Sequence, residues 1–477
     1  MADDPTTGPP TKNTEGTSMD SPTNTSAPRP AAAEPKPARH TLQIGRLAVP
    51  MVMGEIVGYL TMLILVAMVG RMGSNALYVR SLFLPLGMVF SAINAALAVS
   101  TQVACAMSKG KDAPEDAFPL TVSMTKVWVV VGTSLTLLLS FGAPAFATFF
   151  DVSAAAHHEF IWFLRWMSVV SLLGFGPALC ASALRGFGFA RQGLILTLVS
   201  SFVEIALVAW LGFGTGLGMN SLPIAAAVCA VAGTAAGLWL LRRAGLWRRG
   251  QRAPWQPATL GHIRSVGLPV GATLGIISLY SLALVWVLGP FGEATVAGFS
   301  TASSVQSLII MPALVLGSAT AIVINQQRGA GAYGSVAPTY RSGILLSFAV
   351  FAVIALATFF GRDPIAQLMT GDDEAAAVAA RYLAVVGLTY VVEGPVLVAL
   401  TLLEHVGGGG RAVVLNIVYF GGNVVVGRWA VAAADSPDGL YWTVAVSNLV
   451  SAVALVVGAA YVRRLVAGAK RAEAEAC

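Results

Sequence analysis

The chain has 477 residues, of which 56% are hydrophobic and only 11% are charged, with a mean hydropathy of +0.74. A soluble domain has roughly 25% charged residues, so this chain has too little charge to cover the surface of a soluble globule. The short alternating segments of a transmembrane β-barrel are absent. The net charge of +6 comes from basic residues in short loops, which orient a membrane protein and do not indicate a nucleic-acid partner.

The cysteines and histidines indicate neither a metal site nor a disulfide framework. Three of the four cysteines stand alone in apolar runs, the fourth is the last residue, and the five histidines are scattered. No spacing fits a metal-ligand set or a disulfide pattern. Nucleotide-binding motifs and Ser/His/Asp arrangements are also absent; Gly407–Gly410 lacks the Lys-Ser/Thr of a phosphate loop. We predict no metal, no cofactor and no catalytic residue, so the protein is not an enzyme.

The N-terminal residues 1–40 differ in composition from the rest. They contain eight prolines with many Thr, Ser, Asp and Lys, which predicts a disordered tail. After it we expect a six-helix bundle at 41–243, a cytoplasmic linker at 244–262, a second six-helix bundle at 263–465 and a cytoplasmic tail at 466–477. The fold class is an all-α membrane protein.

Twelve apolar segments follow the tail, each near the ~20 residues that a bilayer helix needs. In chain order they are about 47–70, 79–107, 121–143, 158–183, 193–214, 221–242, 265–288, 298–326, 341–361, 377–404, 411–433 and 440–463.

The loops alternate in charge. Arginines and lysines follow the even-numbered segments, above all in 242–264 with six arginines, whereas the opposite loops carry most of the aspartates. The positive-inside rule then places both termini in the cytoplasm. We expect a multi-pass protein of the cell (inner) membrane, surrounded by lipid and monomeric.

Residues 50–110 and 269–329 share one template with a constant offset of 219, and eleven of the 61 positions are identical. The matches include a proline taken as a helix start (Pro50, Pro269), a Gly-x-x-Gly turn at 70–73 and 289–292, and a glycine at a helix end (Gly110, Gly329). An internal repeat in a hydrophobic chain is typical of a transporter built from two related halves. With six helices each, the halves share one orientation.

Carboxyl groups inside apolar segments are costly and are functional candidates by default. Glu393 lies midway along the tenth segment, followed by Gly394-Pro395, and a proline bends a membrane helix. Thr389 and Tyr390 lie on its face of the helix. A buried carboxyl with hydroxyls in reach can bind a cation, or bind and release a proton near neutral pH.

Glu204 ends a polar stripe in the fifth segment. Thr197, Ser200 and Ser201 precede it by seven, four and three residues and share its helix face. The offset of 219 carries the stripe onto Asn416, Tyr419 and Asn423. Such stripes line an internal cavity or join packed helices by hydrogen bonds. We expect Glu204 and Asn423 to face each other's half across a central cleft.

The sequence around two further carboxyls, Glu55 and Glu404, gives weaker support for a functional role. Glu55 shares a face with Tyr59 in the first segment, where it either couples ions or caps a water-filled vestibule. Glu404 ends the tenth segment beside Gly407–Gly410, which favours a helix end followed by a flexible loop. The candidates for ion or proton coupling are thus Glu393, Glu204 and Glu55. The candidates for the substrate cavity are Asn416, Tyr419, Asn423, Thr197, Ser200, Ser201, Tyr390, Thr389, Tyr59 and Asn94.

Several motifs resemble those of MATE (multidrug and toxic compound extrusion) transporters. Leu-Pro-Val-Gly-Ala from Leu268 and Leu-Gly-Pro-Phe-Gly from Leu288 resemble that family's seventh helix and following turn. Leu-Arg-Gly-Phe-Gly at 184–188 resembles the end of its fourth helix, and 326–331 the end of its eighth. The resemblance covers about residues 41–465. It implies two pseudo-symmetric six-helix bundles forming a V, with alternating access and export coupled to inward Na⁺ or H⁺ flow.

The chain departs from the family at its acidic positions. The aspartate of helix one in many bacterial members falls on Leu65, and the glutamate of helix seven in one branch falls on Ile277. The acidic residue of helix ten is retained as Glu393, whereas the asparagine of helix five falls on Glu204. A different set of carboxylates would carry the ion chemistry, and isolated glutamates beside hydroxyls suit protons at least as well as Na⁺.

We therefore predict a secondary antiporter that exports small organic compounds, cationic or neutral and amphipathic, coupled to H⁺ or Na⁺. A lipid-intermediate flippase of the wider superfamily is the alternative, but it would need a basic cavity, and these polar positions are acidic. A major-facilitator transporter would carry Gly-x-x-x-Asp-Arg-x-Gly-Arg, which residues 108–112 lack. The repeat and the missing catalytic constellation argue against a membrane enzyme or receptor.

The topology can be tested with a cysteine at Gly250, in a chain whose native Cys477 is replaced. Because we place residues 242–264 in the cytoplasm, this thiol should resist membrane-impermeant maleimides in intact cells and react after permeabilisation. Ready labelling from outside would invert the predicted orientation.

Overall fold

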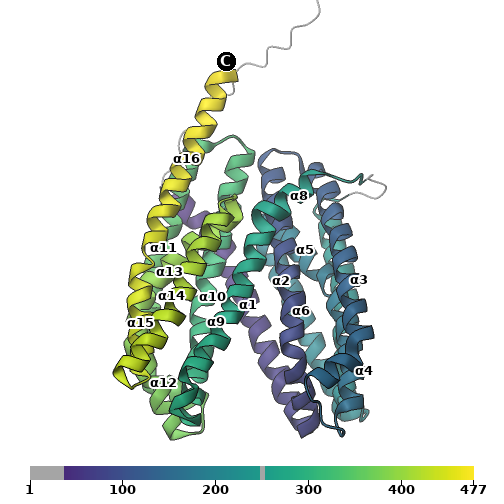
Figure 1. The fold of residues 1–477 in the computed structure, drawn as a ribbon. Helices are drawn as coiled ribbons and strands as arrows, with labels where there is room; N and C mark the ends of the chain where they lie inside the picture. Colours follow the sequence, from purple (N-terminus) through teal and green to yellow (C-terminus); the bar gives the residue numbers. More distant parts are fainter. Residues whose placement is uncertain (1–36, 248–252, 477) are drawn as a thin grey trace, which may run out of the picture. The chain divides into compact units, whose positions relative to one another are not determined.

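A computed structural model describes residues 37–247 and 253–476, and the part it describes is helical throughout (Figure 1). The chain divides into two units, Met1–Glu34 and Pro35–Cys477, and all of the helices belong to the second. Helix α1 begins at Pro37, so the last four residues of the predicted tail 1–40 are already helical. The rest of that tail and residues 248–252 of the predicted linker, with Gly250, lie outside the described residues.

Twelve helical segments among the described residues are long and apolar enough to cross a membrane. They match the twelve predicted segments one for one and are longer, from 25 to 38 residues, so they tilt or project beyond the ~20 residues that a bilayer requires. The helices of the first half are α1 (Pro37–Met72), α2 (Ser74–Gly110), α3 (Ala117–Phe149), α4 (His157–Leu173), α5 (Phe175–Gly186), α6 (Ala190–Ala209) and α7 (Ser221–Arg243). Those of the second half are α8 (Ala258–His262), α9 (Leu268–Leu288), α10 (Glu293–Gly329), α11 (Val336–Met369), α12 (Asp373–Val386), α13 (Tyr390–Val406), α14 (Gly409–Ala434), α15 (Asp438–Val450) and α16 (Val453–Ala476).

The offset of 219 reappears in the boundaries of the helices. Adding 219 to the ends of α2 gives the ends of α10, and the single 3₁₀ turns that follow them, Pro114–Asp116 and Tyr333–Ser335, also correspond. Gly73 and Gly292 precede α2 and α10 with φ of +138° and +92°, values that glycine adopts without strain. The repeat read from the sequence is therefore a repeat of structure.

One prediction made from the repeat was wrong. Pro269 lies in the first turn of α9, as expected of a helix-start proline, but Pro50 lies inside α1. The helix before Pro50 extends back to Pro37 because residues 44–51 are packed against the second half, where Ile44, Leu47, Ala48 and Met51 belong to its buried cluster. The turn before Pro269 is a π-turn, Ile263–Gly267, a common distortion where a proline removes a backbone donor.

The first helix of each half packs partly against the other half. The N-terminal part of α1 packs against α10 and α11, while α1 also packs along α6. In the second half α9 packs along α14 and also against α2, and the π-turn before it packs on α2. Each half otherwise has its own buried cluster, one centred on Trp128, Phe160 and Phe163 and one on Phe299, Tyr382 and Tyr441.

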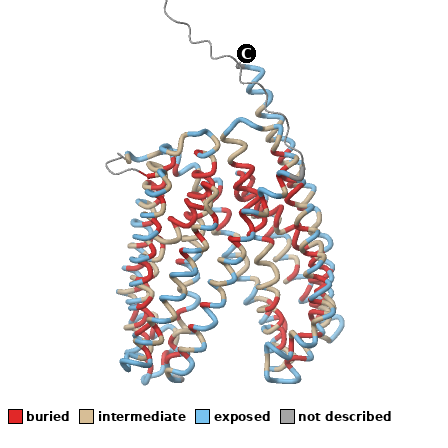
Figure 2. Tube along the Cα trace, turned by 180° about the vertical axis from the view of Figure 1, so that it is seen from behind, coloured by how far each residue is buried: buried red, intermediate tan, exposed pale blue. Residues whose placement is uncertain are grey.

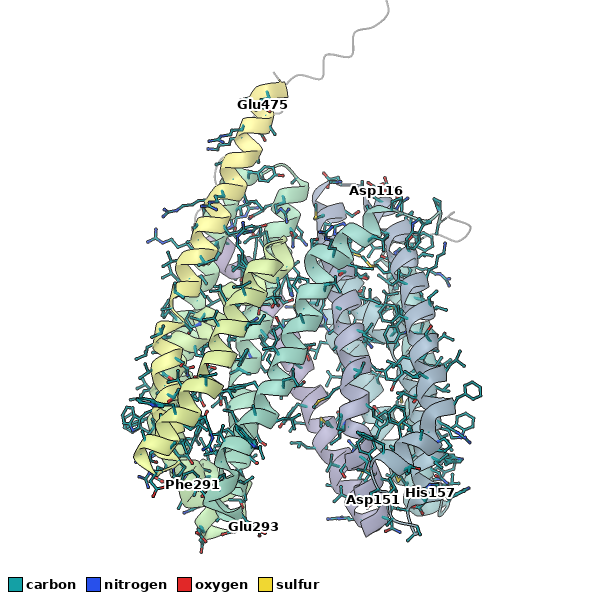
Figure 3. The ribbon with its side chains drawn as sticks, viewed as in Figure 1. Asp116, Asp151, His157, Phe291, Glu293 and Glu475 are labelled. Carbon is teal, nitrogen blue, oxygen red and sulfur yellow. The ribbon has the colours of Figure 1, made fainter. Side chains whose placement is uncertain are left out.

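The ends of the helices alternate between two sides. Asp116, which follows α2, and Glu475, near the end of α16, lie at one end, and Asp151, His157, Phe291 and Glu293 lie at the other (Figure 3). Buried residues gather between the halves at the end that carries Glu475, whereas the inner helices become intermediate or exposed toward the opposite end (Figure 2).

At the closed end α2 and α10 meet at the paired glycines. A Cβ atom on Gly110 would lie 2.0 Å from the carbonyl oxygen of Gln326, and one on Gly329 would lie 2.1 Å from that of Met107. Nearby, Gln102 donates from Nε2 to Ser318 Oγ at 2.8 Å, and Gln326 donates to the carbonyl of Gly186 at 2.9 Å. Only glycine allows this backbone approach, as at other close helix crossings in membranes.

We predict that Gly329→Val separates these helix ends. A side chain at this crossing must displace backbone, and overpacking typically costs about 1–3 kcal/mol. With cysteines at positions 102 and 318 and the native cysteines replaced, oxidative cross-linking should fall by at least half in the valine variant. Gly421→Val is the matched control, because a Cβ there would meet no atom within 4 Å. Equal cross-linking in Gly329→Val and the parent would contradict the crossing.

Candidate functional site

Glu393 lies at the centre of a hydrogen-bonded network inside the second half. Its side chain is only 7% exposed. Gln306 of α10 donates to Oε1 at 3.4 Å, and Asn448 of α15 donates to Oε2 at 3.0 Å. Both donors are neutral amides, so the carboxyl group has two polar partners but no cation partner among the ion pairs of the described residues.

Hydroxyl groups of neighbouring helices hold the two amides. Tyr382 of α12 donates to Gln306 Oε1 at 2.8 Å, and Tyr419 of α14 donates to Asn448 Oδ1. Asn448 also donates to Thr389 Oγ1 at 2.8 Å. Side chains from α10, α12, α13, α14 and α15 thus converge on one carboxyl, and each amide is oriented by a tyrosine.

The backbone is irregular beside Glu393. Between α12 and α13 the chain forms a 3₁₀ turn, Gly387–Thr389, and Glu393 lies in the first turn of α13 with Pro395 two residues later. The helix is therefore interrupted by a 3₁₀ turn before Glu393, while α13 continues through Pro395. Irregular backbone at membrane depth is tolerated where protein surrounds it, and Tyr390 and Gly387 are buried here.

Aromatic side chains close the site. Tyr382 contacts Phe299 and Tyr441 edge to face, and Tyr280 of α9 and Tyr390 lie close enough to Glu393 to interact with its charge. The hydroxyl of Tyr390 is buried and has no hydrogen-bond partner among the described residues. The surroundings of Glu393 are therefore polar at short range and apolar beyond.

Glu404 forms a smaller cluster at the far end of α13. Thr273 of α9 donates to Glu404 Oε1 at 2.6 Å, and Asn416 of α14 donates to Thr273 Oγ1 at 2.9 Å. Glu404 is 6% exposed. It lies eleven residues after Glu393, about three helical turns or ~16 Å along the same face.

The prediction of a flexible loop after Glu404 is wrong. Gly407 caps α13 in the left-handed conformation with φ of +97°, and α14 begins at Gly409. Asn325 and Arg328 of α10 bond to the carbonyls of His405 and Val406. The glycine-rich run is thus a tight turn between two helices, and it fixes Glu404 inside the protein.

Glu55 forms an ion pair. Its Oε1 lies 3.2 Å from Nη1 of Arg185, and the Glu55 side chain is 43% exposed. Arg185 and Glu404 occupy equivalent positions, since 185 + 219 = 404, and their partners come from the equivalent helices α1 and α9. The same backbone position therefore carries a paired cation in one half and a carboxyl without a cation in the other.

Glu204 lies in the first half within electrostatic reach of Arg80. The stripe that precedes it faces the first half's own helices: Thr197 donates back to the carbonyl of Gly193, and a Cβ on Gly233 of α7 would lie 3.4 Å from Ser200 Oγ. Ser201, Tyr59 and Asn94 are half-buried. The contact with α7 agrees with helix packing for Ser200, whereas the hydroxyl of Thr197 bonds within its own helix.

Asn423 does not line an open cleft, because it is 0% exposed. It lies one turn after Tyr419 inside the second half. Asn416, Tyr419, Thr389 and Tyr390, in contrast, all belong to the Glu393 or Glu404 clusters. The structure thus brings these candidates of the second half together. Glu204 and Asn423, in contrast, lie in separate surroundings.

Three members of the Glu393 network were missed from the sequence: Gln306, Tyr382 and Asn448. The signal was present, because an amide within a long apolar segment needs a partner, and Gln306 and Asn448 are such residues. Among the described residues no group of three or more His, Cys, Asp or Glu side chains could hold a metal ion.

Twelve membrane-crossing helices in two repeated halves, with a carboxyl network buried in one half, define a membrane transporter. Residues 50–210 and 269–429 each match the family model described as MatE, and these two ranges are themselves 219 residues apart. The chain belongs to the MatE family, and it is a multi-pass membrane transporter rather than an enzyme.

Individual relatives and solved structures agree with this assignment. The multidrug resistance protein NorM of Burkholderia vietnamiensis is 24% identical over 450 residues, which cover 87% of this chain and 93% of that protein. The Vibrio cholerae MATE transporter VcmN in its bent form matches with a TM-score of 0.85 and 18% identity, over 91% of this chain and 99% of that one. A MATE protein in a straight conformation gives 0.81 and 22%, over 91% and 97%.

We predict that Asn448→Ala destabilises the protein. The change leaves Glu393 Oε2 and the Tyr419 hydroxyl without their partner, and unpaired buried groups cost about 1–3 kcal/mol. The melting temperature in detergent should fall by several degrees, as ~4 °C per kcal/mol or less is typical of large domains. Asn94→Ala, at a half-buried position of α2, is the matched control and should melt within a degree of the parent, ~0.5 kcal/mol or less. Equal melting of the two variants would remove Asn448 from the network.

Proposed function

We propose that the protein is a proton-coupled antiporter that exports small cationic or neutral amphipathic compounds across the inner membrane by alternating access. The family assignment supports transport, and several relatives, among them those of Burkholderia, are named multidrug resistance proteins. The coupling step and the class of substrate are inferred from this chain's own residues. We propose that it works as a monomer.

The observation that carries the coupling proposal is the environment of Glu393. A carboxylate without a nearby cation is expensive in the hydrocarbon region, whereas a protonated carboxyl is not. Gln306 and Asn448 supply N–H donors that stabilise the ionised form when the proton has left. Both protonation states therefore have a defined partner set, which is what a group that binds and releases a proton in each cycle requires.

The same geometry favours H⁺ over Na⁺. Sodium prefers several fixed oxygen ligands, as hard cations do, but the amide oxygens of Gln306 and Asn448 accept hydrogen bonds from Tyr382 and Tyr419. The atoms that these amides direct at Glu393 are nitrogens. The site thus offers few free oxygens around the carboxyl.

The other carboxyls differ in their access to a cation. Glu55 is paired with Arg185, and Glu204 has Arg80 within reach, whereas Glu393 takes part in no ion pair among the described residues. Glu404 resembles Glu393, since its partners are a hydroxyl and an amide. We propose that Glu393 is the main coupling residue and Glu404 a second protonatable group on the same helix face.

We propose that both termini lie in the cytoplasm, in line with the positive-inside rule. The end closed by Gly110 and Gly329 is then the cytoplasmic one, and the conformation is the one that releases substrate outward. An acidic interior attracts cationic or neutral compounds more than anions, which supports the substrate class.

The test uses the full-length protein in proteoliposomes with a fluorescent cationic dye as substrate. A pH gradient should drive dye transport in the parent, and Glu393→Gln should reduce it roughly tenfold or more, because the amide cannot carry a proton. A Na⁺ gradient at equal pH should drive little transport. Glu55→Gln is the control and should stay within about twofold, as expected for a partly exposed ion pair.

Two results would overturn the proposal. Undiminished proton-driven transport in correctly inserted Glu393→Gln would remove this residue from coupling. Transport driven by the Na⁺ gradient alone would make sodium the coupling ion.

A further inference from the structure

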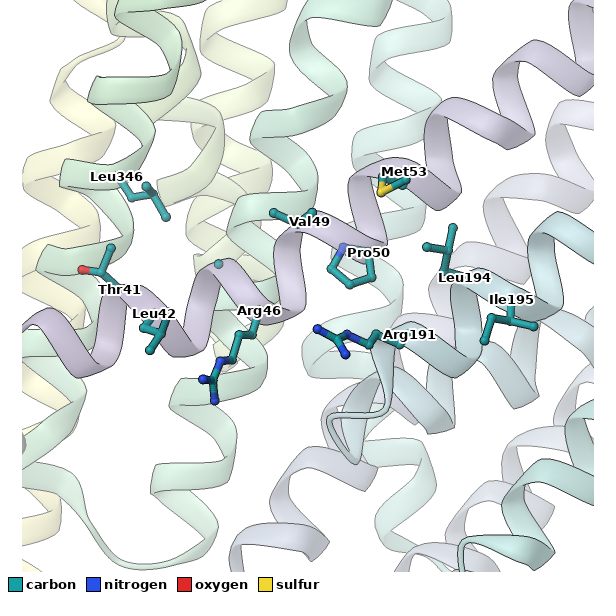
Figure 4. Close-up of a pocket in the computed structure, with 11 residues that line it drawn as sticks. Thr41, Leu42, Arg46, Val49, Pro50, Met53, Arg191, Leu194, Ile195 and Leu346 are labelled. Atoms are coloured by element: carbon teal, nitrogen blue, oxygen red, sulfur yellow. The ribbon is translucent and has the colours of Figure 1, made fainter.

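A groove of about 960 Å³ lies on the outside of the helices where α1, α6 and α11 meet (Figure 4). Its wall is apolar and includes Leu42, Val49, Met53, Leu194, Ile195 and Leu346. Several of these side chains are largely exposed, with Val49 at 61% and Ile195 at 58%. In a protein that spans a membrane, such a surface faces the acyl chains of lipids.

Two arginines line this groove. Arg46 of α1 and Arg191 of α6 extend to the same side of α1, below Val49, Met53 and Leu346 in the view of Figure 4. Both are exposed, and neither takes part in an ion pair among the described residues. The groove has no acidic residue in its lining, so the positive charge is not neutralised locally.

The depth of the arginines fits a lipid headgroup. Arg191 is the second residue of α6, at the start of a membrane-crossing helix, and Met53 and Ile195 lie one turn or more further into their helices. Arg46 is the tenth residue of α1, one turn after Leu42, so the charge lies in the first third of both helices, with most of the apolar wall beyond it. This is the order in which a phospholipid presents its phosphate and its acyl chains.

The repeat shows that the fold does not require these arginines. Adding 219 to Arg46 and Arg191 gives Ser265 and Gly410, whereas Val49, Leu194 and Ile195 become Leu268, Val413 and Val414. The apolar character is kept at the equivalent positions of both halves, but the arginines are not. In the second half the nearest arginines, Arg264 and Arg411, are each one residue away from the equivalent position.

We propose that this groove binds one anionic phospholipid, with its phosphate between Arg46 and Arg191 and an acyl chain along the apolar wall. Guanidinium groups match phosphate oxygens in geometry and charge, and basic pockets between membrane helices take anionic headgroups. Because α1 and α6 belong to the first half and Leu346 to the second, the bound lipid touches both halves.

The proposal can be tested by lipid binding to the purified full-length protein in neutral detergent, measured by native mass spectrometry. Phosphatidylglycerol should bind in preference to phosphatidylcholine with the same acyl chains. Arg46→Gln with Arg191→Gln should weaken phosphatidylglycerol binding about 25-fold, at about fivefold for each arginine. Arg46→Lys with Arg191→Lys should retain most of it.

A matched double variant controls for net charge. Arg463→Gln with Arg464→Gln removes two exposed arginines of α16 that do not line the groove, and it should bind phosphatidylglycerol within about twofold of the parent, because the loss is one of general surface charge only. An equal loss in both double variants, or none in either, would overturn the proposal.

A second pair of variants tests whether the apolar wall of the groove takes part in lipid binding. Ile195→Trp should fill the groove and reduce binding, whereas Val414→Trp at the equivalent place of the second half should not. An excess of glycerol 3-phosphate should fail to displace the lipid. Complete displacement by this soluble phosphate, or equal binding in the two tryptophan variants, would show a free phosphate site instead of a lipid site and would overturn the proposal.

Discussion

The close approach of α2 and α10 at Gly110 and Gly329 is the constraint on which the arrangement of the two halves depends. Each glycine lies where a Cβ would collide with the backbone of the other helix. Because the two residues are equivalent under the repeat, the contact lies on the pseudo-symmetry axis and closes both halves at the same end. The hydrogen bonds from Gln102 and Gln326 across this contact are few, so helix packing contributes more than polar bonding, as is usual between membrane helices.

The two halves have the same backbone arrangement but carry different polar side chains at equivalent positions. Lys109 bonds to the carbonyl of Phe187, and its equivalent Arg328 bonds to that of Val406, so even a side-chain contact to the backbone is repeated. At the next equivalent position Arg185 pairs with Glu55, whereas Glu404 meets only Thr273 and Asn416. The carboxyl of the first half therefore has a cation partner, and that of the second half has none in the part of the chain that the structure describes. Among the described residues, the buried carboxyls, Glu393 and Glu404, both lie in the second half and take part in no ion pair.

A helix break supports the site in the second half. The 3₁₀ turn Gly387–Thr389 interrupts the tenth span just before Glu393, and Thr389 both donates to Val386 and accepts from Asn448. The hydroxyl therefore satisfies a carbonyl at the end of α12 and links the break to α15. Such a break is tolerated because α11 and α15 pack against it, which ties the polar network to the packing of the bundle.

The sequence by itself determined the number of spans, the repeat and its register, because apolar run length and fixed-offset glycines are local properties that folding does not alter. It also identified Glu393, since a carboxyl in an apolar run is conspicuous anywhere. Only the tertiary structure decided which of the carboxyl groups forms an ion pair. Glu55 and Arg185 are 130 residues apart and Glu404 and Thr273 are 131 apart, and periodicity along one helix cannot say which residue of another helix faces it. The burial of Asn423, the role of Asn448 and Gln306, and the meeting of Arg46 with Arg191 depend in the same way on how separate helices pack.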